Sequence, residues 1–276
     1  MLSEKTRDIT ANGRTIELTY EAEVLLDKRL LATPPLAASQ CRERTKEMAV
    51  IAKEALHEAL AAMFTYTQKG VLSVEEKEQK LDVMEDQLSD FLLELSSHSL
   101  TDEDSRTVTE LLHSISDFER ISDHAINMIE IGAEMNQNDQ SFSDSARADF
   151  ATLFAALTEI SESTVKAFSE QDTSIAMTVE PLEEVIDDLT ATIRNKHISR
   201  LRTGECSPEL GVYLSDLLIN CERVSDHCSN IAVAIIEIGQ SKLLSHEYMT
   251  ALKAERTPQF IESYTAYGQK YRLSAN

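Results

Sequence analysis

Apolar residues recur at intervals of three and four along most of this chain, and polar residues fill the positions between them. Over residues 36–68 the apolar positions with this spacing are Met48, Ile51, Ala52, Ala55, Ala59, Ala62 and Met63. Such spacing puts the apolar side chains on one face of an α-helix. The sequence therefore predicts a first helix over 36–68, and Gly70 is expected to end it.

Two further helices are predicted before residue 140. Ser73 and Glu76 have the spacing of a capping box, which opens a helix that runs to about His98. Thr101, followed by three acidic residues, is a second start signal. The apolar positions of these helices are Leu81, Met84, Leu88, Phe91, Leu92, Leu95, Leu111, Leu112, Ile115, Phe118, Ile126 and Ile129. Three amphipathic helices in succession predict a three-helix bundle over 36–140.

The same plan begins again at Ser143. The apolar positions of the next helix are Phe150, Leu153, Phe154, Leu157, Ile160, Val165 and Phe168. A helix from about Ser174 to Arg202 follows it. Ser207 then precedes a proline, which is tolerated in the first turn, and opens a helix to about Gly239. These segments predict a second three-helix bundle over 141–240.

The two ends of the chain differ from these bundles. Residues 1–35 contain a turn signal at Asn12 and Gly13 and end in a Pro-Pro pair, which predicts a loosely packed lead-in or linker. Residues 241–276 predict a helical tail with the aromatic residues Tyr248, Phe260, Tyr264, Tyr267 and Tyr271. With only 7 Gly and 5 Pro, the composition favours helices throughout. The predicted fold class is all-α, a tandem repeat of two three-helix bundles.

One block of nine residues occurs in the third helix of each predicted bundle. ERISDHAIN at 119–127 and ERVSDHCSN at 222–230 share six identities at a constant offset of 103. Acidic pairs in the preceding helices repeat as well, at an offset of 105. Self-similarity of this kind indicates that the chain contains two copies of one structural unit.

Each copy contains two pairs of acidic residues spaced four apart. The pairs are Glu119 with Asp123, Glu222 with Asp226, Glu78 with Asp82, and Glu183 with Asp187. On a helix each pair presents adjacent carboxylates, which destabilise it by about 0.2–0.5 kcal/mol unless a hard cation bridges them. About eight such pairs are expected by chance with 48 Asp and Glu among 276 residues. The prediction of metal sites therefore depends on the repetition, and a repeated packing motif is the alternative.

The other identities of the block have two interpretations each. His124 and His227 follow the second carboxylate directly, about 100° round the helix from it, so they either ligate the metal or hydrogen-bond to an adjacent helix. Arg120 and Arg223 follow the first carboxylate, and we expect them to form salt bridges between helices. A phosphate-binding role is disfavoured because acidic residues surround each arginine.

The net charge limits the classes of partner. The 26 Lys and Arg against 48 Asp and Glu give a formal charge of -22, which repels nucleic acid and anionic lipid and attracts cations. We therefore expect neither nucleic-acid binding nor direct lipid binding. No run reaches the roughly 20 apolar residues of a membrane helix, and the start of the chain lacks the apolar stretch of a signal peptide, which predicts a soluble chain. The four cysteines form no CxxC pair, which indicates a reducing cytoplasm, and Cys221 and Cys228 are expected in the core.

A metalloenzyme is the competing hypothesis. Glu54 with His57 and Glu110 with His113 have the Glu-x-x-His spacing of di-iron carboxylate bundles, but the second repeat has no counterpart of either pair. No glycine-rich phosphate loop, HExxH or GxSxG motif occurs. A purely structural adaptor, whose acidic residues only solvate it, is the third hypothesis.

The two blocks, with Glu78-x-x-x-Asp82 and Glu183-x-x-x-Asp187 before them, resemble the PhoU family. The resemblance covers about 36–239 and implies two three-helix bundles with multinuclear metal clusters bound by E(D)xxxD motifs. It implies that the metal ligands are Glu119, Asp123, Glu222, Asp226, Glu78, Asp82, Glu183 and Asp187. Iron or zinc is expected before manganese or magnesium. Asp117 stands opposite Asn220, and Glu85 opposite Thr190, so the two clusters are expected to differ in charge and nuclearity.

Three further segments narrow the resemblance. They are similar to parts of the cytoplasmic PhoU-like domain of bacterial sodium-dependent phosphate cotransporters. Their sequences are LDKRLLATPPLAASQ, HISRLRTGECSPELG and HEYMTALKAERTPQFIESYTAYGQKYRL. The resemblance implies a non-catalytic regulatory domain that contacts a membrane phosphate transporter, in cis or in trans, at the inner face of the membrane. A homo-oligomer is left open.

Overall fold

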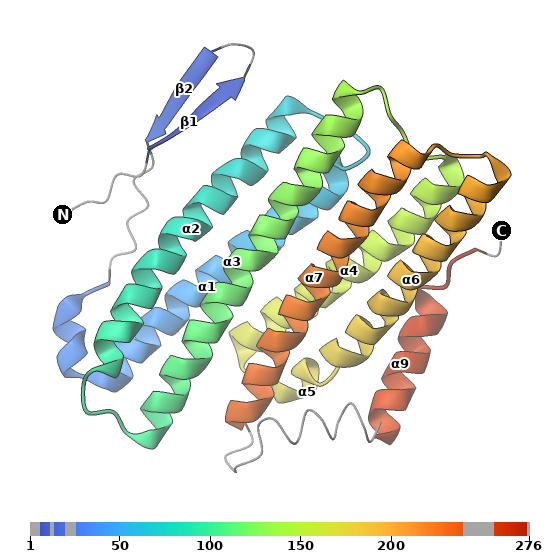
Figure 1. The fold of residues 1–276 in the computed structure, drawn as a ribbon. Helices are drawn as coiled ribbons and strands as arrows, with labels where there is room; N and C mark the ends of the chain where they lie inside the picture. The colour runs from blue at the N-terminus through green and yellow to red at the C-terminus, as the bar shows by residue number, and fades with distance from the viewer. Residues whose placement is uncertain (1–5, 12–13, 20–25, 240–256, 275–276) are drawn as a thin grey trace.

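Two bundles of long helices lie side by side in the computed structural model, which describes residues 6–11, 14–19, 26–239 and 257–274 (Figure 1). The first bundle consists of α1 (Pro34–Ala62), α2 (Gln68–Ser96) and α3 (Asp102–Gln137). The second consists of α4 (Asp144–Glu170), the short α5 (Thr173–Ala176), α6 (Val179–Thr203) and α7 (Pro208–Gly239). The all-α tandem repeat of two three-helix bundles is therefore confirmed.

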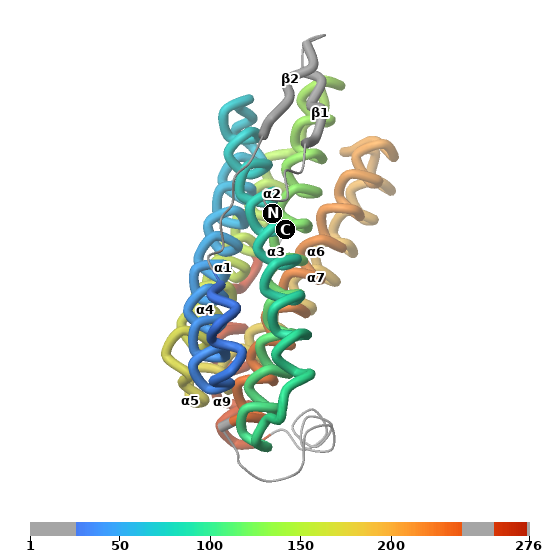
Figure 2. The backbone as a smooth tube through the Cα atoms, turned by 90° about the vertical axis from the view of Figure 1, so that its left-hand side faces the viewer, coloured from blue at the N-terminus to red at the C-terminus, as the bar shows by residue number. Residues whose placement is uncertain are grey.

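The two bundles meet mainly through α3 and α7, which lie side by side at the centre of the molecule (Figure 1). The first helix of each bundle, α1 and α4, forms a second contact between them. Seen from the side, the long helices run along one common direction (Figure 2). The repeated blocks are on α3 and α7, so both copies lie at the junction of the bundles.

Three of the predicted helix starts coincide with side-chain caps. The Thr101 hydroxyl accepts a hydrogen bond from the backbone N–H of Asp104, and Ser143 accepts one from Ala146. Both caps satisfy N–H groups that have no partner within the helix. Ser207 does the same for Leu210 at the start of α7, with an N–O distance of 3.4 Å.

The predicted boundary between the first two helices was wrong. Helix α1 ends at Ala62, and α2 begins at Gln68, where the Thr67 hydroxyl accepts from the backbone N–H of Gly70. The glycine therefore lies in the first turn of α2, where a capped N–H makes it tolerable, and does not end α1. Ser73 lies inside α2 and donates to the Glu58 carboxylate at 2.7 Å instead of capping the helix.

The helix predicted from Ser174 to Arg202 is also divided. Asp172 accepts hydrogen bonds from Ser174 and Ile175 and starts α5, which ends after one turn. Helix α6 then begins at Val179 and has Pro181 in its first turn, where a proline is tolerated. The starts of α5 and α6 lie within eight residues of each other, and the spacing of apolar residues does not show that the helix is interrupted between them.

The core of the two bundles is continuous. Phe118 on α3 packs edge-to-face against Phe168 on α4, with ring centroids 5.2 Å apart, and both side chains are fully buried. Cys221 and Cys228 are also fully buried, as predicted, and burial raises the pKa of the Cys228 thiol to about 12. The apolar faces predicted from the spacing of three and four are thus the ones that pack together.

The ends of the chain are more structured than predicted. Strands β1 (Thr6–Ala11) and β2 (Arg14–Thr19) pair antiparallel, from Thr6 opposite Thr19 to Ala11 opposite Arg14, and a 3-10 helix (Lys28–Ala32) precedes α1. No strands were predicted in this lead-in, although both β1 and β2 contain Thr and Ile, which favour strands. The turn predicted at 12–13 lies outside the described residues.

The tail contains α9 (Pro258–Lys270), which packs against α6 in the second bundle (Figure 1). Phe260 and Tyr271 are buried there. Tyr271 donates to Glu159 on α4, and Lys270 forms an ion pair with the same carboxylate at 2.7 Å. Residues 240–256 of the predicted tail, with Tyr248, lie outside the described residues. Among the described helices, none is long and apolar enough to cross a membrane.

Candidate metal centres

The first group of carboxylates lies where α2 and α3 pack together. Glu119 and Asp123 are one turn apart on α3, and the side chains that act on Glu119 from α2 are Asp82 and Glu85. The pKa of Glu119 is raised to about 8, first by burial and then, in decreasing order, by the charge of Asp123, the hydrogen bond with Asp123, and the charges of Glu85 and Asp82. Four acidic side chains from two helices therefore crowd one place.

The second group lies at the corresponding place in the second bundle. Glu222 and Asp226 on α7 line a cleft of about 540 Å³ together with Asp187 from α6. Glu222 accepts hydrogen bonds from the Thr190 hydroxyl at 2.7 Å and from the Arg194 guanidinium at 3.1 Å. The carboxylates of this group are thus partly neutralised by basic and hydroxyl side chains.

Arg223 completes this cleft. Its guanidinium lies 3.5 Å from the Asp226 carboxylate, three residues along the same helix. The salt bridge expected between helices is thus formed within α7 instead. Arg120, its counterpart, lines a different cleft of about 400 Å³ between α3 and α7, together with Asp117 and Glu237.

Six of the eight predicted ligands lie in the two groups, and the role of the other two, Glu78 and Glu183, stays a prediction. Glu78 and Glu183 lie one turn before Asp82 and Asp187 on their helices. Glu183 is buried, and neither glutamate is among the residues that act most strongly on Glu119 or line the second cleft. Within the described ranges, no three His, Cys, Asp or Glu side chains stand in an arrangement that could hold a metal ion. The two groups are therefore crowded carboxylates, all with oxygen donors, and a cation would have to draw them closer.

The histidines of the block connect the two bundles. His124 Nδ1 lies 2.8 Å from Asn220 Oδ1, and His227 Nδ1 lies 2.8 Å from Asp117 Oδ1. The two rings stack with centroids 5.5 Å apart. Burial lowers the pKa of His124, and its hydrogen bond to Asn220 opposes that shift. Each histidine thus contacts the opposite repeat, as the second of the two interpretations predicted.

The asparagines of the block take part in the same contacts. Asn127 donates to Asn220 at 3.2 Å, and Asn230 donates to Asp117 at 3.4 Å. The difference between Asp117 and Asn220 therefore lies in the junction of the bundles. The expectation that it would make the two carboxylate groups unequal was wrong, because both residues turn toward the opposite repeat. The difference between Glu85 and Thr190 does fall in the two groups.

The di-iron arrangement is not assembled. Glu110 is buried and forms a bidentate ion pair with Arg42, at 3.1 and 2.6 Å. Gln171 donates to the same carboxylate at 3.3 Å. His57 lies 3.0 Å from the Ser161 hydroxyl, which is on α4 of the other bundle. These residues of the Glu-x-x-His pairs therefore hold helices together.

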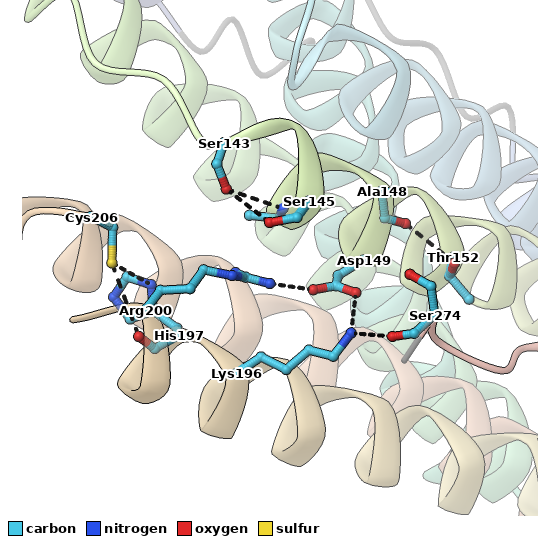
Figure 3. Close-up of polar contacts among 11 residues, drawn as sticks. Ser143, Ser145, Ala148, Asp149, Thr152, Lys196, His197, Arg200, Cys206 and Ser274 are labelled. Carbon is cyan, nitrogen blue, oxygen red and sulfur yellow. Dashed lines mark hydrogen bonds and ion pairs between the residues drawn. The ribbon is translucent and has the colours of Figure 1, made fainter. Parts of the chain in front are cut away.

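A buried ionic network was not foreseen from the sequence. Asp149 on α4 accepts from Lys196 at 2.8 Å and from Arg200 at 2.5 Å, both on α6 (Figure 3). Lys196 also donates to the backbone carbonyl of Ser274, beyond α9, at 2.7 Å. One carboxylate thus ties α4 to α6, and one ammonium group ties α6 to the tail. The i, i+4 spacing of Lys196 and Arg200 was the only signal in the sequence.

Three comparisons with known proteins agree with this architecture. The PhoU domain family matches residues 45–132 and 151–235, which are more than half of the chain and fall within the two bundles. A relative from Thermotoga maritima, a phosphate-specific transport system accessory protein PhoU homolog 1, is 23% identical over 197 residues, which are 71% of this chain and 84% of the relative. A PhoU homolog of the same kind from Deinococcus radiodurans is 24% identical over 156 residues, 56% of this chain and 72% of the relative.

Two solved structures share the fold. PhoU from Pseudomonas aeruginosa superposes with a TM-score of 0.69 at 16% identity and covers 74% of this chain and 97% of its own. The phosphate transport system regulatory protein PhoU from Streptococcus pneumoniae gives a TM-score of 0.67 at 16% identity, over 77% of this chain and 99% of its own. Nearly the whole of each neighbour thus has a counterpart in this chain, and about a quarter of this chain has none there.

Proposed function

Because the chain belongs to the PhoU family, we propose that it is a regulator of phosphate transport that binds cations at its two carboxylate groups. Proteins of this family are regulatory and non-enzymatic, so the metalloenzyme hypothesis is set aside. Both curated relatives are accessory proteins of phosphate-specific transport, which supports the same role for this chain.

The crowding around Glu119 is the observation that carries the proposal. Like charges forced together disfavour ionisation, and a cation placed between them reverses that effect. Asp82, Glu85, Glu119 and Asp123 would hold a cation in the first bundle. The ligands in the second would be Asp187, Glu222 and Asp226. Carboxylate oxygens are ligands for manganese and magnesium, and also bind iron and zinc.

A bound cation would link two helices in each bundle. The carboxylates of each group come from α2 and α3, or from α6 and α7. Cation occupancy would therefore stiffen the packing of these helix pairs and change the surface that they offer to a partner. Repulsion within the groups is what the cation would remove.

The proposed partner is a membrane phosphate transporter, at the cytoplasmic face of the membrane. The family match leaves residues 1–44 and 236–276 outside it, and these include two of the three segments that resemble a sodium-dependent phosphate cotransporter. We propose that the bundles act on such a transporter, whether joined to it or separate from it. Their acidic charge makes a basic surface of the transporter the natural contact.

Elemental analysis tests the cation proposal directly. The protein, purified without chelator, is expected to carry at least one metal ion per chain. Chelation is expected to lower its melting temperature. A variant with Glu119, Asp123, Glu222 and Asp226 all changed to alanine should lose both the metal and the effect of chelation. Less than about one metal per chain, together with unchanged melting of the variant, would sink the cation proposal.

Phosphate uptake tests the transport role separately. Cells that lack the chain are expected to take up radiolabelled phosphate at an altered rate, and the wild-type chain should restore the original rate. The chain should also copurify with the transporter from detergent-solubilised membranes. Unaltered uptake and no copurification would refute the transport role whatever the metal content is.

A further inference from the structure

We infer that the surface of the second bundle beneath α9 is a docking site for an amphipathic helix of a partner protein, and that α9 is a detachable cover of this site. The surface, called the tail surface, includes Glu159 on α4 and Asp188 and Lys196 on α6. The partner helix has aromatic residues at the spacing found in α9 and a basic residue near its end. The inference does not depend on cation binding.

The aromatic residues of the tail lie on one face of α9. Phe260, Tyr264, Tyr267 and Tyr271 follow one another at intervals of four, three and four. Phe260 and Tyr271 are buried, and the two tyrosines between them pack against the core. The residues on the opposite side of the helix, such as Gln269, are exposed. Anchors at these intervals are the pattern with which an amphipathic helix binds a complementary surface.

Carboxylates on the tail surface receive the polar groups of the tail. Tyr264 donates to Asp188 on α6, and Tyr271 donates to Glu159 on α4. Lys270 forms an ion pair with the same Glu159 carboxylate at 2.7 Å. The tail surface therefore fits a helix that is both aromatic and basic. The net charge of -22 also favours the approach of a basic helix.

Two observations indicate that α9 is detachable. It lies outside the family match, which ends at residue 235, so the two bundles form the family fold without it (Figure 1). It has 13 residues, packs against α6, and only Phe260 and Tyr271 are buried among the described residues of the tail. Beyond α9, Lys196 holds the Ser274 carbonyl at 2.7 Å (Figure 3). Elements with few buried apolar contacts open at a lower free energy than the whole molecule.

A cover on the same chain competes strongly with a free helix. A tethered helix has an effective concentration of about 1 mM. If α9 binds the tail surface with an intrinsic dissociation constant below about 0.1 mM, it weakens the binding of a free helix by at least about tenfold. The partner helix therefore binds well only after α9 has left, so α9 acts as an autoinhibitory contact.

A fluorescently labelled peptide of residues 257–274, which stands in for the partner helix, tests this inference by anisotropy with the full chain. In wild type the tail surface is covered. In the full-length variant Phe260→Ala/Tyr271→Ala the cover loses both buried anchors, and the peptide is expected to bind at least about tenfold more tightly than to wild type. A peptide that carries the same two substitutions is the matched control and should bind neither protein.

Exchange of charge identifies the surface to which the peptide binds. Glu159→Lys, added to the open variant, should weaken binding of the peptide several-fold, because the attraction to Lys270 becomes repulsion. A peptide with Lys270→Glu should recover that loss. Lys270→Glu in an otherwise wild-type chain keeps both buried aromatic residues and should open the surface in part. It provides the same test if circular dichroism shows that Phe260→Ala/Tyr271→Ala does not fold.

Each of the other outcomes overturns a defined part of the inference. Equal binding of the peptide to wild type and to both open variants would overturn the role of α9 as a cover. No binding to either open variant at peptide concentrations up to about 1 mM, or binding that Glu159→Lys leaves unchanged, would overturn the docking site. Dimers of the wild-type chain in light scattering that Phe260→Ala/Tyr271→Ala abolishes would overturn the partner protein and assign the tail surface to α9 of a second copy.

Discussion

Replacing Glu119 by glutamine is expected to stabilise the metal-free protein at pH 8 and to leave its stability near pH 5 almost unchanged. Glutamine has nearly the shape of a protonated glutamate and cannot ionise. The ordinary pKa of this carboxyl is 4.5, and burial with the neighbouring acids raises it to about 8 in the folded protein. Between these two values the folded chain holds a proton that the unfolded chain has released.

The sign of the effect follows from this difference. Because the folded state binds more protons, the free energy of unfolding falls as the pH rises from about 4.5 to about 8. The Glu119 side chain is only half-buried, so solvent screening reduces the full value of the shift, and we expect a loss of about 1–2 kcal/mol. For a chain of this size such a loss corresponds to a few degrees in Tm.

Urea unfolding followed by circular dichroism at pH 5, 6, 7 and 8 measures the effect, with a chelator present throughout. The difference in unfolding free energy between Glu119→Gln and wild type cancels the titrating groups that do not interact with Glu119. The free energy of unfolding of the variant should exceed that of wild type by an amount that increases with pH. A difference that is the same at pH 5 and pH 8 would refute the crowding of acids around this side chain.

Glu222→Gln is the matched control in the other repeat. Glu222 accepts from Thr190 and pairs with Arg194, so glutamine there removes an attraction and not a repulsion. Because the ion pair is partly exposed, we expect a loss of no more than about 1 kcal/mol. The same substitution at equivalent positions of the two repeats is therefore expected to have opposite signs at pH 8.

Three further variants test contacts that hold the fold together. Asp149→Ala removes the carboxylate partner of two mostly buried basic groups and should lower the free energy of unfolding by about 3–5 kcal/mol in urea titrations. Lys28→Ala, at an exposed ion pair, should cost less than about 1 kcal/mol. Asp117→Ala removes the partner of His227 and should cost about 1–3 kcal/mol in the same assay, and Asp117→Asn, which keeps the accepting oxygen, should cost clearly less. Tyr271→Ala should release α9 from α4 and increase chymotrypsin cleavage at the aromatic residues within it, while the bundles remain folded by circular dichroism.

The sequence predicts the helical fold well because each helix has one continuous apolar face. Local signals mislead where two of them compete. Glycine is common at helix ends, so Gly70 was expected to end the first helix. Instead the Thr67 hydroxyl accepts a hydrogen bond from its N–H, and the residue lies inside the first turn of α2. The short α5 could not be predicted from apolar spacing, because the single turn that Asp172 starts is too short to show a repeat of apolar residues.

The candidate site was predictable in part. The spacing of four places Glu119 beside Asp123 on any helix, and the structure adds Glu85 and Asp82 from the neighbouring helix. The ion pair between Arg194 and Glu222 joins residues 28 apart and depends on how α6 packs against α7. Alignment of the two repeats shows only that an arginine replaces a serine at that position.

The repeated block contributes both to the junction of the bundles and to the acidic groups, so its repetition is not by itself evidence for a cation site. His124, His227 and the asparagines form the junction of the bundles, a role that requires repetition whether or not a cation binds. The glutamate and aspartate of each block face the acidic groups, and in the second block Arg223 does so as well. The six identities therefore cannot all be counted as evidence for metal. The argument for cations depends on the crowding of charge around Glu119, and for that reason the sites must be tested by changing carboxylates while the junction stays intact.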